Sequence, residues 1–100
     1  MALLTKGFNS GTARYDHWDK HHGEFEPPPL TVAGYEARAD AFLGGVKVAT
    51  VLECVRTAPD GRKRTCRYDR VTREYGVLAE DGVLLTYFKA SEDYFHRKCV

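Results

Sequence analysis

A lysine and two adjacent histidines precede a carboxylate in the stretch Lys20-His21-His22-Gly23-Glu24. Histidine changes its protonation state near neutral pH, so its ring can donate or accept a proton during catalysis. A neighbouring lysine can stabilise an anionic transition state. This combination suits phosphoryl chemistry that relies on general acid–base catalysis. The alternative interpretation is an exposed, polar helix end with no chemical role.

The spacing of the histidines limits what they can do. Successive residues on a helix point about 100° apart, so His21 and His22 cannot both face one site unless the helix ends between them. His17 and His21 have the i, i+4 spacing with which two histidines can hold a metal ion. A zinc site made from this pair and a carboxylate is the minor alternative, and we predict no metal.

The cysteines do not form a recognisable metal or redox motif. Cys54, Cys66 and Cys99 are odd in number and widely spaced, without a Cys-x-x-Cys pair. We expect three small, buried, unpaired side chains in a reducing compartment, with a disulfide between two of them as the less favoured alternative. Burial also argues against a nucleophilic role for any of the three.

Two helices are predicted in the first half of the chain, after a loose leader over residues 1–12. The first runs from Ala13 to about His22, with Asn9, Ser10 or Thr12 as its cap. Pro27-Pro28-Pro29 then prevents helix, because proline lacks an amide hydrogen and has a fixed φ. The second helix covers residues 32–43, with Thr31 as its N-cap and Gly44-Gly45 as its end.

The second half of the chain has the pattern of an antiparallel sheet. Segments rich in β-branched residues are separated by Asp-Gly turns, which are typical of hairpins. The predicted strands are 46–56, 63–69, 74–79 and 83–89, and a short helix follows over 92–98 with Ser91 as its cap. We predict an α+β fold in which the N-terminal helices and a short C-terminal helix all lie on one face of a four-stranded β-meander. The other face of the sheet is expected to be open to a ligand.

Composition predicts one domain over residues 1–100. The chain is 43% hydrophobic and 29% charged, with a net charge of +1, which is typical of a globular protein. No apolar run reaches the roughly 18 residues that span a bilayer, so no membrane partner is expected. Seven basic residues lie close together in the sequence, at Arg56, Arg62, Lys63, Arg64, Arg67, Arg70 and Arg73. Such a cluster favours binding to phosphate or nucleic acid, or it protects a sheet edge from aggregation.

The segment Lys20-His21-His22-Gly23-Glu24-Phe25 resembles the Lys-His-x-x-Asp/Glu-Phe motif of the colicin D-type toxin domains that cleave transfer RNA. Residues 35–43 and 67–89 are more loosely similar to the second helix and the strands of C-terminal modules in polymorphic and contact-dependent bacterial toxins. The resemblance implies a barnase/colicin/RelE-like fold. It also implies a metal-independent ribonuclease without a cofactor, which cleaves tRNA or another structured RNA by attack of the 2′-hydroxyl.

The resemblance further implies how such a domain would be used. It would act in the cytoplasm of a target cell, delivered as the C-terminal part of a secreted bacterial toxin. An acidic cognate immunity or antitoxin protein would neutralise it, because opposite charges favour such pairing. The alternatives are a non-enzymatic module that binds protein or nucleic acid, and an enzyme of another class.

Carried over to this chain, the resemblance makes His21 the general acid or base and Lys20 the cation beside the phosphate. Hydroxyl groups of Thr86 and Tyr87 can contact the phosphate, and Lys89 or Arg67 can supply a second cation. The predicted catalytic set is His21, Lys20, Thr86, Tyr87 and Lys89. The residues expected to contact RNA are Arg62, Lys63, Arg64, Arg67, Trp18 and His22. Ordinary strand or core packing is the alternative for Thr86, Tyr87 and Trp18.

Overall fold

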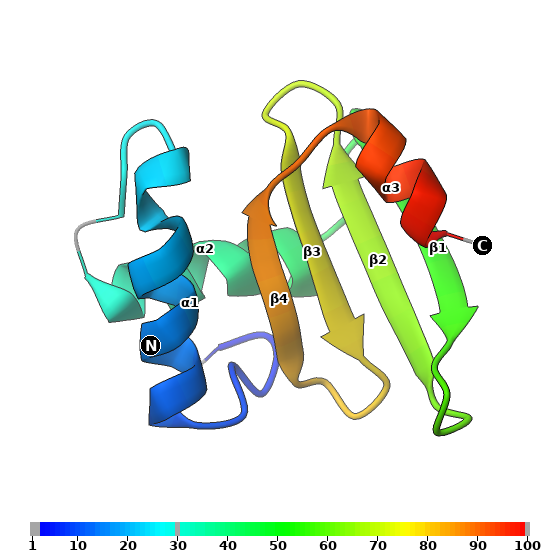
Figure 1. Ribbon diagram of the computed structural model, residues 1–100, viewed down its shortest axis with the longest axis horizontal. Coiled ribbons are helices and arrows are strands. Elements are labelled where there is room, and N and C mark those ends of the chain that lie inside the picture. The colour runs from blue at the N-terminus through cyan, green and yellow to red at the C-terminus, as the bar shows by residue number, and fades with distance from the viewer. Residues whose placement is uncertain (1–2, 30, 100) are drawn as a thin grey trace.

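The structure, a computed structural model, describes residues 3–29 and 31–99. Its elements in chain order are α1 (Gly11–His21), a 3₁₀ turn η1 (His22–Glu24), α2 (Val32–Gly44), β1 (Val51–Thr57), β2 (Lys63–Asp69), β3 (Glu74–Ala79), β4 (Leu84–Lys89) and α3 (Glu92–Lys98) (Figure 1). The strands form one antiparallel sheet in the order β1-β2-β3-β4. The predicted α+β class, with its four-stranded meander and short C-terminal helix, is confirmed.

Each helix begins at a capping side chain that the sequence predicts. The Ser10 hydroxyl accepts a hydrogen bond from the amide of Ala13, and Thr31 and Ser91 make the same bond at the starts of α2 and α3. These bonds satisfy amides that have no partner within the helix. No helix in the described part of the chain is long and apolar enough to cross a membrane.

The first strand begins later than the sequence predicts, at Val51 rather than Val46. Val51 pairs with Asp69, which is the last residue of β2. Beyond that pair the chain of β2 turns away, so residues 46–50 have no neighbouring strand to complete a ladder. Val46 and Val48 are therefore exposed despite their high strand propensity.

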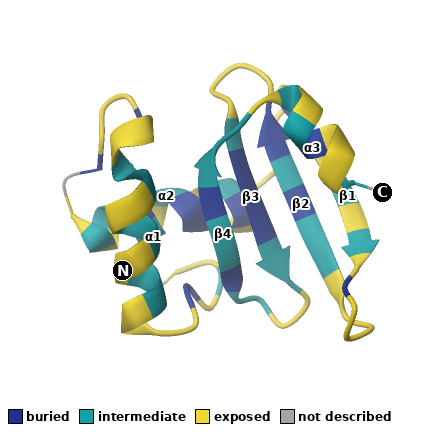
Figure 2. Cartoon of the chain, in the orientation of Figure 1, coloured by how far each residue is buried: buried dark blue, intermediate teal, exposed yellow. Residues whose placement is uncertain are grey.

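The helices cover both faces of the sheet, so the prediction that they share one face is wrong. Strand residues alternate between faces, and β3 is buried on both (Figure 2). Gly76 faces α2, where an added Cβ would come within 2.8 Å of Leu43 Cδ1. Tyr75 and Val77 face the other way and pack with Phe95 of α3. Each face thus has its own core, and α3 covers only part of the second face (Figure 1).

The predicted loose leader is wrong for residues 3–8, while residues 1 and 2 lie outside the described part of the chain. The carboxylate of Asp40, which is buried in α2, accepts hydrogen bonds from the amides of Leu4 and Thr5 at 2.8 Å and 2.7 Å. Phe8 is buried, and its amide donates to Glu36. A buried carboxylate needs such donors, so Asp40 fixes this segment against α2.

The prediction of three unpaired cysteines is also wrong. Cys54 of β1 and Cys99, which follows α3, form a disulfide with an S–S distance of 1.94 Å. Cys66 remains a free, buried thiol opposite Cys54 in the neighbouring strand. The pairing was hidden in the sequence because α3 must first fold back over the sheet to bring Cys99 to β1.

Candidate functional site

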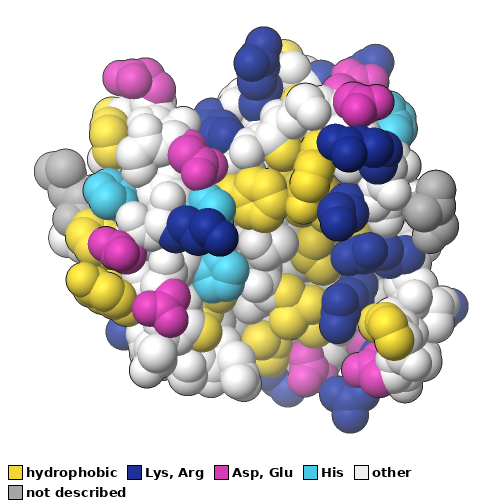
Figure 3. Space-filling model, viewed as in Figure 1, with side chains coloured by type: hydrophobic (Ala, Val, Ile, Leu, Met, Phe, Trp, Pro, Cys, Tyr) yellow, Lys and Arg dark blue, Asp and Glu magenta, His cyan; other side chains and the backbone are white. Residues whose placement is uncertain are grey.

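A groove on the α3 side of the sheet gathers side chains from three elements. Its volume is about 560 Å³, and its lining residues are Asp16, His17, Lys20 and His21 of α1, Thr86 and Phe88 of β4, and Tyr94 of α3. We call it the histidine groove. Figure 3 shows histidine and lysine side chains over α1 beside an apolar surface that extends toward α3. The groove brings together three of the five predicted catalytic residues, namely Lys20, His21 and Thr86.

Two contacts fix the ring of His21. Its Nδ1 lies 2.7 Å from Glu24 Oε2, and because an ionised carboxylate only accepts hydrogen bonds, Nδ1 carries the hydrogen. The ring also stacks on Phe88, with 5.0 Å between centroids. The His21 side chain is only 12% exposed. Nε2 is then the ring nitrogen that can exchange a proton with a bound ligand.

Glu24 and Phe25 explain why the motif continues beyond the histidine. The second carboxylate oxygen of Glu24 accepts the amide hydrogen of Lys89 at 3.0 Å, which ties η1 to the end of β4. Phe25 is 1% exposed and packs on the rings of Tyr87 and Tyr35. Glu24 therefore orients His21, and Phe25 anchors the segment in the core. Glu24 was part of the sequence motif but not of the predicted site.

His22 and Trp18 do not line the histidine groove, although both were predicted to contact RNA. His22 Nδ1 donates to the carbonyl of Trp18 at 2.7 Å, and its ring stacks on the indole at 4.5 Å. Trp18 Nε1 donates to the carbonyl of Pro29 at 3.0 Å, and the indole packs against the α2-side core. Helix α1 ends at His21, so the two adjacent histidines diverge as helix geometry requires.

Tyr87 and Lys89 lie on the opposite face of the sheet from Thr86, which argues against their predicted catalytic roles. Tyr87 is fully buried, and its hydroxyl donates to the carboxylate of Glu74. Burial first, and that hydrogen bond second, raise the pKa of its phenol well above 10.0. Lys89 Nζ donates to the carbonyl of Thr72 at 2.5 Å. The period-two alternation of β4 separates these residues from the groove.

The predicted RNA-contacting cations divide into two groups. Arg67 is engaged by Glu53 at 2.6 Å and by the carbonyls of Phe42 and Gly45 at the end of α2, so it has a structural role. Arg62, Lys63 and Arg64 instead line a cavity of about 240 Å³ at the end of the sheet, which Asp60, Glu80 and Asp81 also line.

Arg56 is a further basic residue on the groove side of the sheet. It pairs with Arg64, which shares the face of Cys66 and Tyr68. Its Nε is buried, and it has no hydrogen-bond partner among residues 3–29 and 31–99. Figure 3 shows a column of lysine and arginine side chains on the side of the apolar surface away from α1. The histidine groove thus has histidines at one border and cations beyond the other.

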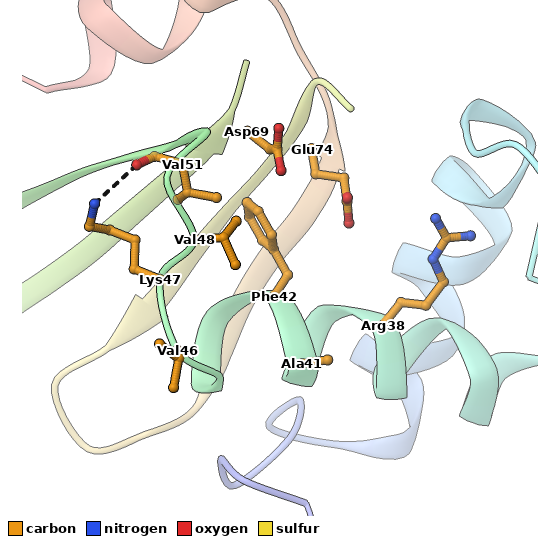
Figure 4. Close-up of a pocket in the computed structure, with 9 residues that line it drawn as sticks. All are labelled: Arg38, Ala41, Phe42, Val46, Lys47, Val48, Val51, Asp69 and Glu74. Atoms are coloured by element: carbon orange, nitrogen blue, oxygen red, sulfur yellow. Dashed lines mark hydrogen bonds between the residues drawn. The ribbon is translucent and has the colours of Figure 1, made fainter. Parts of the chain in front are cut away.

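Another cavity lies on the α2 side, with a volume of about 340 Å³ (Figure 4). Its acidic groups already have partners, since Asp69 accepts the amides of Val71 and Thr72 while Glu74 accepts the Tyr87 hydroxyl. Lys47 Nζ, shown with its dashed contact in Figure 4, donates to the carbonyl of Val51. This cavity offers less scope for proton transfer than the histidine groove does.

Sequence reasoning missed four residues of the histidine groove: Asp16, His17, Phe88 and Tyr94. The i, i+4 spacing of His17 and His21 was the available signal for His17, but it was considered only for a metal. No local pattern could have placed Phe88 and Tyr94, because they approach α1 only in the folded chain. Burial lowers the pKa of His17 below 6.5, with smaller contributions from His21 and Lys20, and Asp16 partly opposes them.

The described residues do not bring three metal-ligand atoms together in the histidine groove. The set of ligand atoms that does converge is the sulfur atoms of Cys54, Cys66 and Cys99, all within 4.8 Å of one another. Two of these sulfurs are joined in the disulfide. A disulfide sulfur is not the thiolate that metals bind.

Neither a scan against protein-family models nor a search of curated proteins finds a match to this chain. The assignment of function therefore depends on the chemistry of the histidine groove.

Proposed function

We propose that this chain is a metal-independent endoribonuclease that cleaves tRNA or another structured RNA. The supporting observation is that a histidine held by a carboxylate lies in one groove with a lysine and a hydroxyl, at His21, Lys20 and Thr86. These are the groups that ribonucleolytic transesterification requires: a proton carrier, a cation and a hydrogen-bond donor.

The reaction removes the proton of a ribose 2′-hydroxyl, whose oxygen then attacks the adjacent phosphorus. The bond from phosphorus to the 5′-oxygen breaks, and that oxygen takes up a proton. The products are a 2′,3′-cyclic phosphate and a 5′-hydroxyl. His21 carries one of these protons through Nε2, Lys20 stabilises the charge on the non-bridging oxygens, and the Thr86 hydroxyl donates to one of them.

RNA would lie across the α3 side of the sheet. Phe88 and Tyr94 in the groove supply aromatic rings on which an unstacked base can rest. Arg56 and Arg64, with Arg62 and Lys63 at the end of the sheet, provide charge for the flanking phosphates. Single-stranded or looped regions of a structured RNA suit this surface, because their bases are free to stack on protein rings.

The likeness of Lys20 to Phe25 to the colicin D-type motif supports a role as a bacterial toxin domain with a barnase/colicin/RelE-like fold. Such a domain would act in the cytoplasm of a target cell after delivery within a longer secreted protein. An acidic immunity or antitoxin protein would cover the basic side of the groove and block RNA. Its association would be fast at low salt and slower at high salt.

The test is incubation of the purified chain with total RNA in EDTA, beside the His21→Ala and His96→Ala variants. His96 is an exposed histidine on α3, outside the groove, and is the matched control. We expect RNA cleavage by the parent chain and by His96→Ala, and a loss of about 100- to 10,000-fold in His21→Ala. His22→Ala should stay within about tenfold of the parent, because His22 contacts the Trp18 side of α1.

Intact RNA with the parent chain would refute the proposal. If that RNA were nevertheless retained on the protein, the non-enzymatic binding module would become the better description. Cleavage that EDTA abolishes would instead indicate a metal-dependent enzyme.

A further inference from the structure

His17 shares the histidine groove with His21. The two residues are four apart on α1, so they lie on the same face of the helix. Their rings are stacked with 6.1 Å between centroids and 24° between planes, and both line the groove. A phosphate that accepts a hydrogen bond of about 2.8 Å from each ring can bridge a gap longer than the distance between these two rings. Both rings can therefore contact the same phosphate group.

The surroundings of His17 leave its ring free to react. His21, His22 and His96 each have a ring nitrogen bonded to a carboxylate or carbonyl oxygen. In the part of the chain that the structure describes, no such partner contacts either ring nitrogen of His17. Its ring is held instead by stacking on Phe8, with centroids 5.1 Å apart. Among the described residues, the ring is therefore oriented without a hydrogen bond to either of its nitrogens.

Phe8 is itself well anchored, so it can act as a fixed support. It is 7% exposed, its amide donates to Glu36, and it forms a β-bridge with Leu84, the first residue of β4. The segment before α1 thus positions His17, whereas Glu24 after α1 positions His21. His17 is therefore held by ring stacking from the segment before α1, and His21 by a hydrogen bond from the segment after it.

The two rings have different environments. His17 is partly buried, and its pKa lies below 6.5 because of burial and the nearby charges of His21 and Lys20, against the opposing effect of Asp16. Among the groove residues on other elements, Tyr94 is the titratable side chain. A neutral imidazole accepts a proton. His21, by contrast, donates Nδ1–H to the Glu24 carboxylate, so Nε2 is the nitrogen that can pass a proton to a ligand.

We propose that His17 and His21 form a general base and general acid pair in which His17 takes the proton of the attacking 2′-hydroxyl and His21 protonates the leaving 5′-oxygen. This inference rests on the proposed ribonuclease function and assigns the second proton carrier of that reaction. His17 gains one proton and His21 loses one, so the number of protons on the pair does not change. After the step His17 is protonated and His21 is neutral, and proton exchange with water restores the starting state.

The first test separates the two roles by changing the leaving group. One RNA substrate has its normal 5′-oxygen at the cleavage site, and a matched substrate has sulfur there, which leaves without protonation. We expect both His17→Ala and His21→Ala to lose about 100- to 10,000-fold on the oxygen substrate. On the sulfur substrate His21→Ala should recover most of its rate, and His17→Ala should not. Recovery by both variants or by neither would overturn the assignment of roles.

Folding is controlled with a second variant at the same position. His17→Phe keeps a ring to stack on Phe8 and has no proton to transfer, so it should be as inactive as His17→Ala while retaining the parent's melting temperature. Parent-like cleavage by His17→Phe would overturn the inference and leave the ribonuclease proposal standing. Intact RNA with the parent chain would overturn both.

A binding measurement tests the pair without any turnover. The ring-proton signals of His17 and His21 are followed by NMR as pH is varied, with and without inorganic phosphate. We expect phosphate to shift the ring-proton signals of both residues together, because one anion contacts both, and to leave the signals of His96 unchanged. If phosphate shifted the signals of His21 alone, or of neither ring, His17 would not belong to the anion site.

Discussion

Glu24 connects His21 to the end of the last strand. One carboxylate oxygen lies 2.7 Å from His21 Nδ1, and the other accepts the amide hydrogen of Lys89 at 3.0 Å. The orientation of the imidazole is thereby tied to the sheet rather than to α1 alone. A single carboxylate three residues after the histidine thus links α1 to β4, two of the three elements that form the groove.

Replacing Glu24 with glutamine should reduce activity through His21. The amide can still accept a hydrogen bond, but the charge that stabilises the imidazolium is gone. A hydrogen bond to a charged group is worth about 1.5–3 kcal/mol, so kcat on RNA should fall by about ten- to a hundredfold. NMR should show changed chemical shifts for the His21 ring protons in Glu24→Gln, because the partner of Nδ1 is altered. Unchanged shifts and an unchanged kcat would contradict a positioning role for Glu24.

Thr86→Ala should mainly reduce RNA cleavage, whereas Tyr87→Phe should mainly reduce stability. Thr86 lines the groove, so Thr86→Ala should lower RNA cleavage while changing the melting temperature little. Tyr87→Phe removes the buried hydroxyl that donates to Glu74, and the loss of this hydrogen bond to a charged group should cost about 1–3 kcal/mol of unfolding free energy. Urea unfolding and cleavage assays on both variants provide the comparison. A larger loss of cleavage in Tyr87→Phe than in Thr86→Ala would mean that the faces are misassigned.

Phe25→Ala should destabilise the whole domain. The ring is 1% exposed and contacts Tyr35 and Tyr87. Truncating a buried phenylalanine to alanine costs about 3–5 kcal/mol, which urea denaturation can measure. Phe25→Leu retains much of the volume and should lose less. Equal stability of the two variants and the parent would contradict the anchoring role.

Reduction of the Cys54–Cys99 disulfide should lower stability. The bond joins residues 45 apart, and a loop of that length restricts the unfolded chain by about 4 kcal/mol in the entropic model. Thermal unfolding with and without a thiol reductant measures the loss. Cys66→Ala, which keeps the disulfide, should respond to the reductant as the parent does, whereas Cys99→Ser should not respond. A parent whose melting temperature is insensitive to reductant would argue against the pairing.

Stability should decline as pH falls through 6.5, in part because of His17. The folded-state pKa of this residue is below 6.5, so the unfolded chain takes up a proton there before the folded chain does. Its contribution is therefore fully favourable above pH 6.5 and is lost as pH decreases. Unfolding free energy measured between pH 7.5 and 5.5 should show a shallower decline in His17→Phe. Identical slopes would contradict the lowered pKa.

Local residue chemistry was sufficient to predict most of the fold. The caps Ser10, Thr31 and Ser91 satisfy helix amides within three residues, and the Asp-Gly turns join strands that are neighbours in the chain. Such interactions join residues that are close in the sequence, so they can be predicted from the sequence alone. The strand over residues 46–56 was predicted too long because its pairing depends on where β2 ends.

The resemblance to the toxin motif singled out His21 and Lys20. The predicted catalytic set placed Thr86 and Tyr87 in one site, although adjacent strand residues face opposite sides of a sheet. The packing of α2 decided which of the two faces the groove. Tyr87 pairs with Gly76 and is buried in the core beneath α2, so Thr86 faces the groove. Tertiary structure likewise brought Tyr94 beside Phe88 and Cys99 beside Cys54. These contacts join residues from different elements. Their geometry is set by the burial of two separate apolar faces of the sheet and by no local sequence pattern.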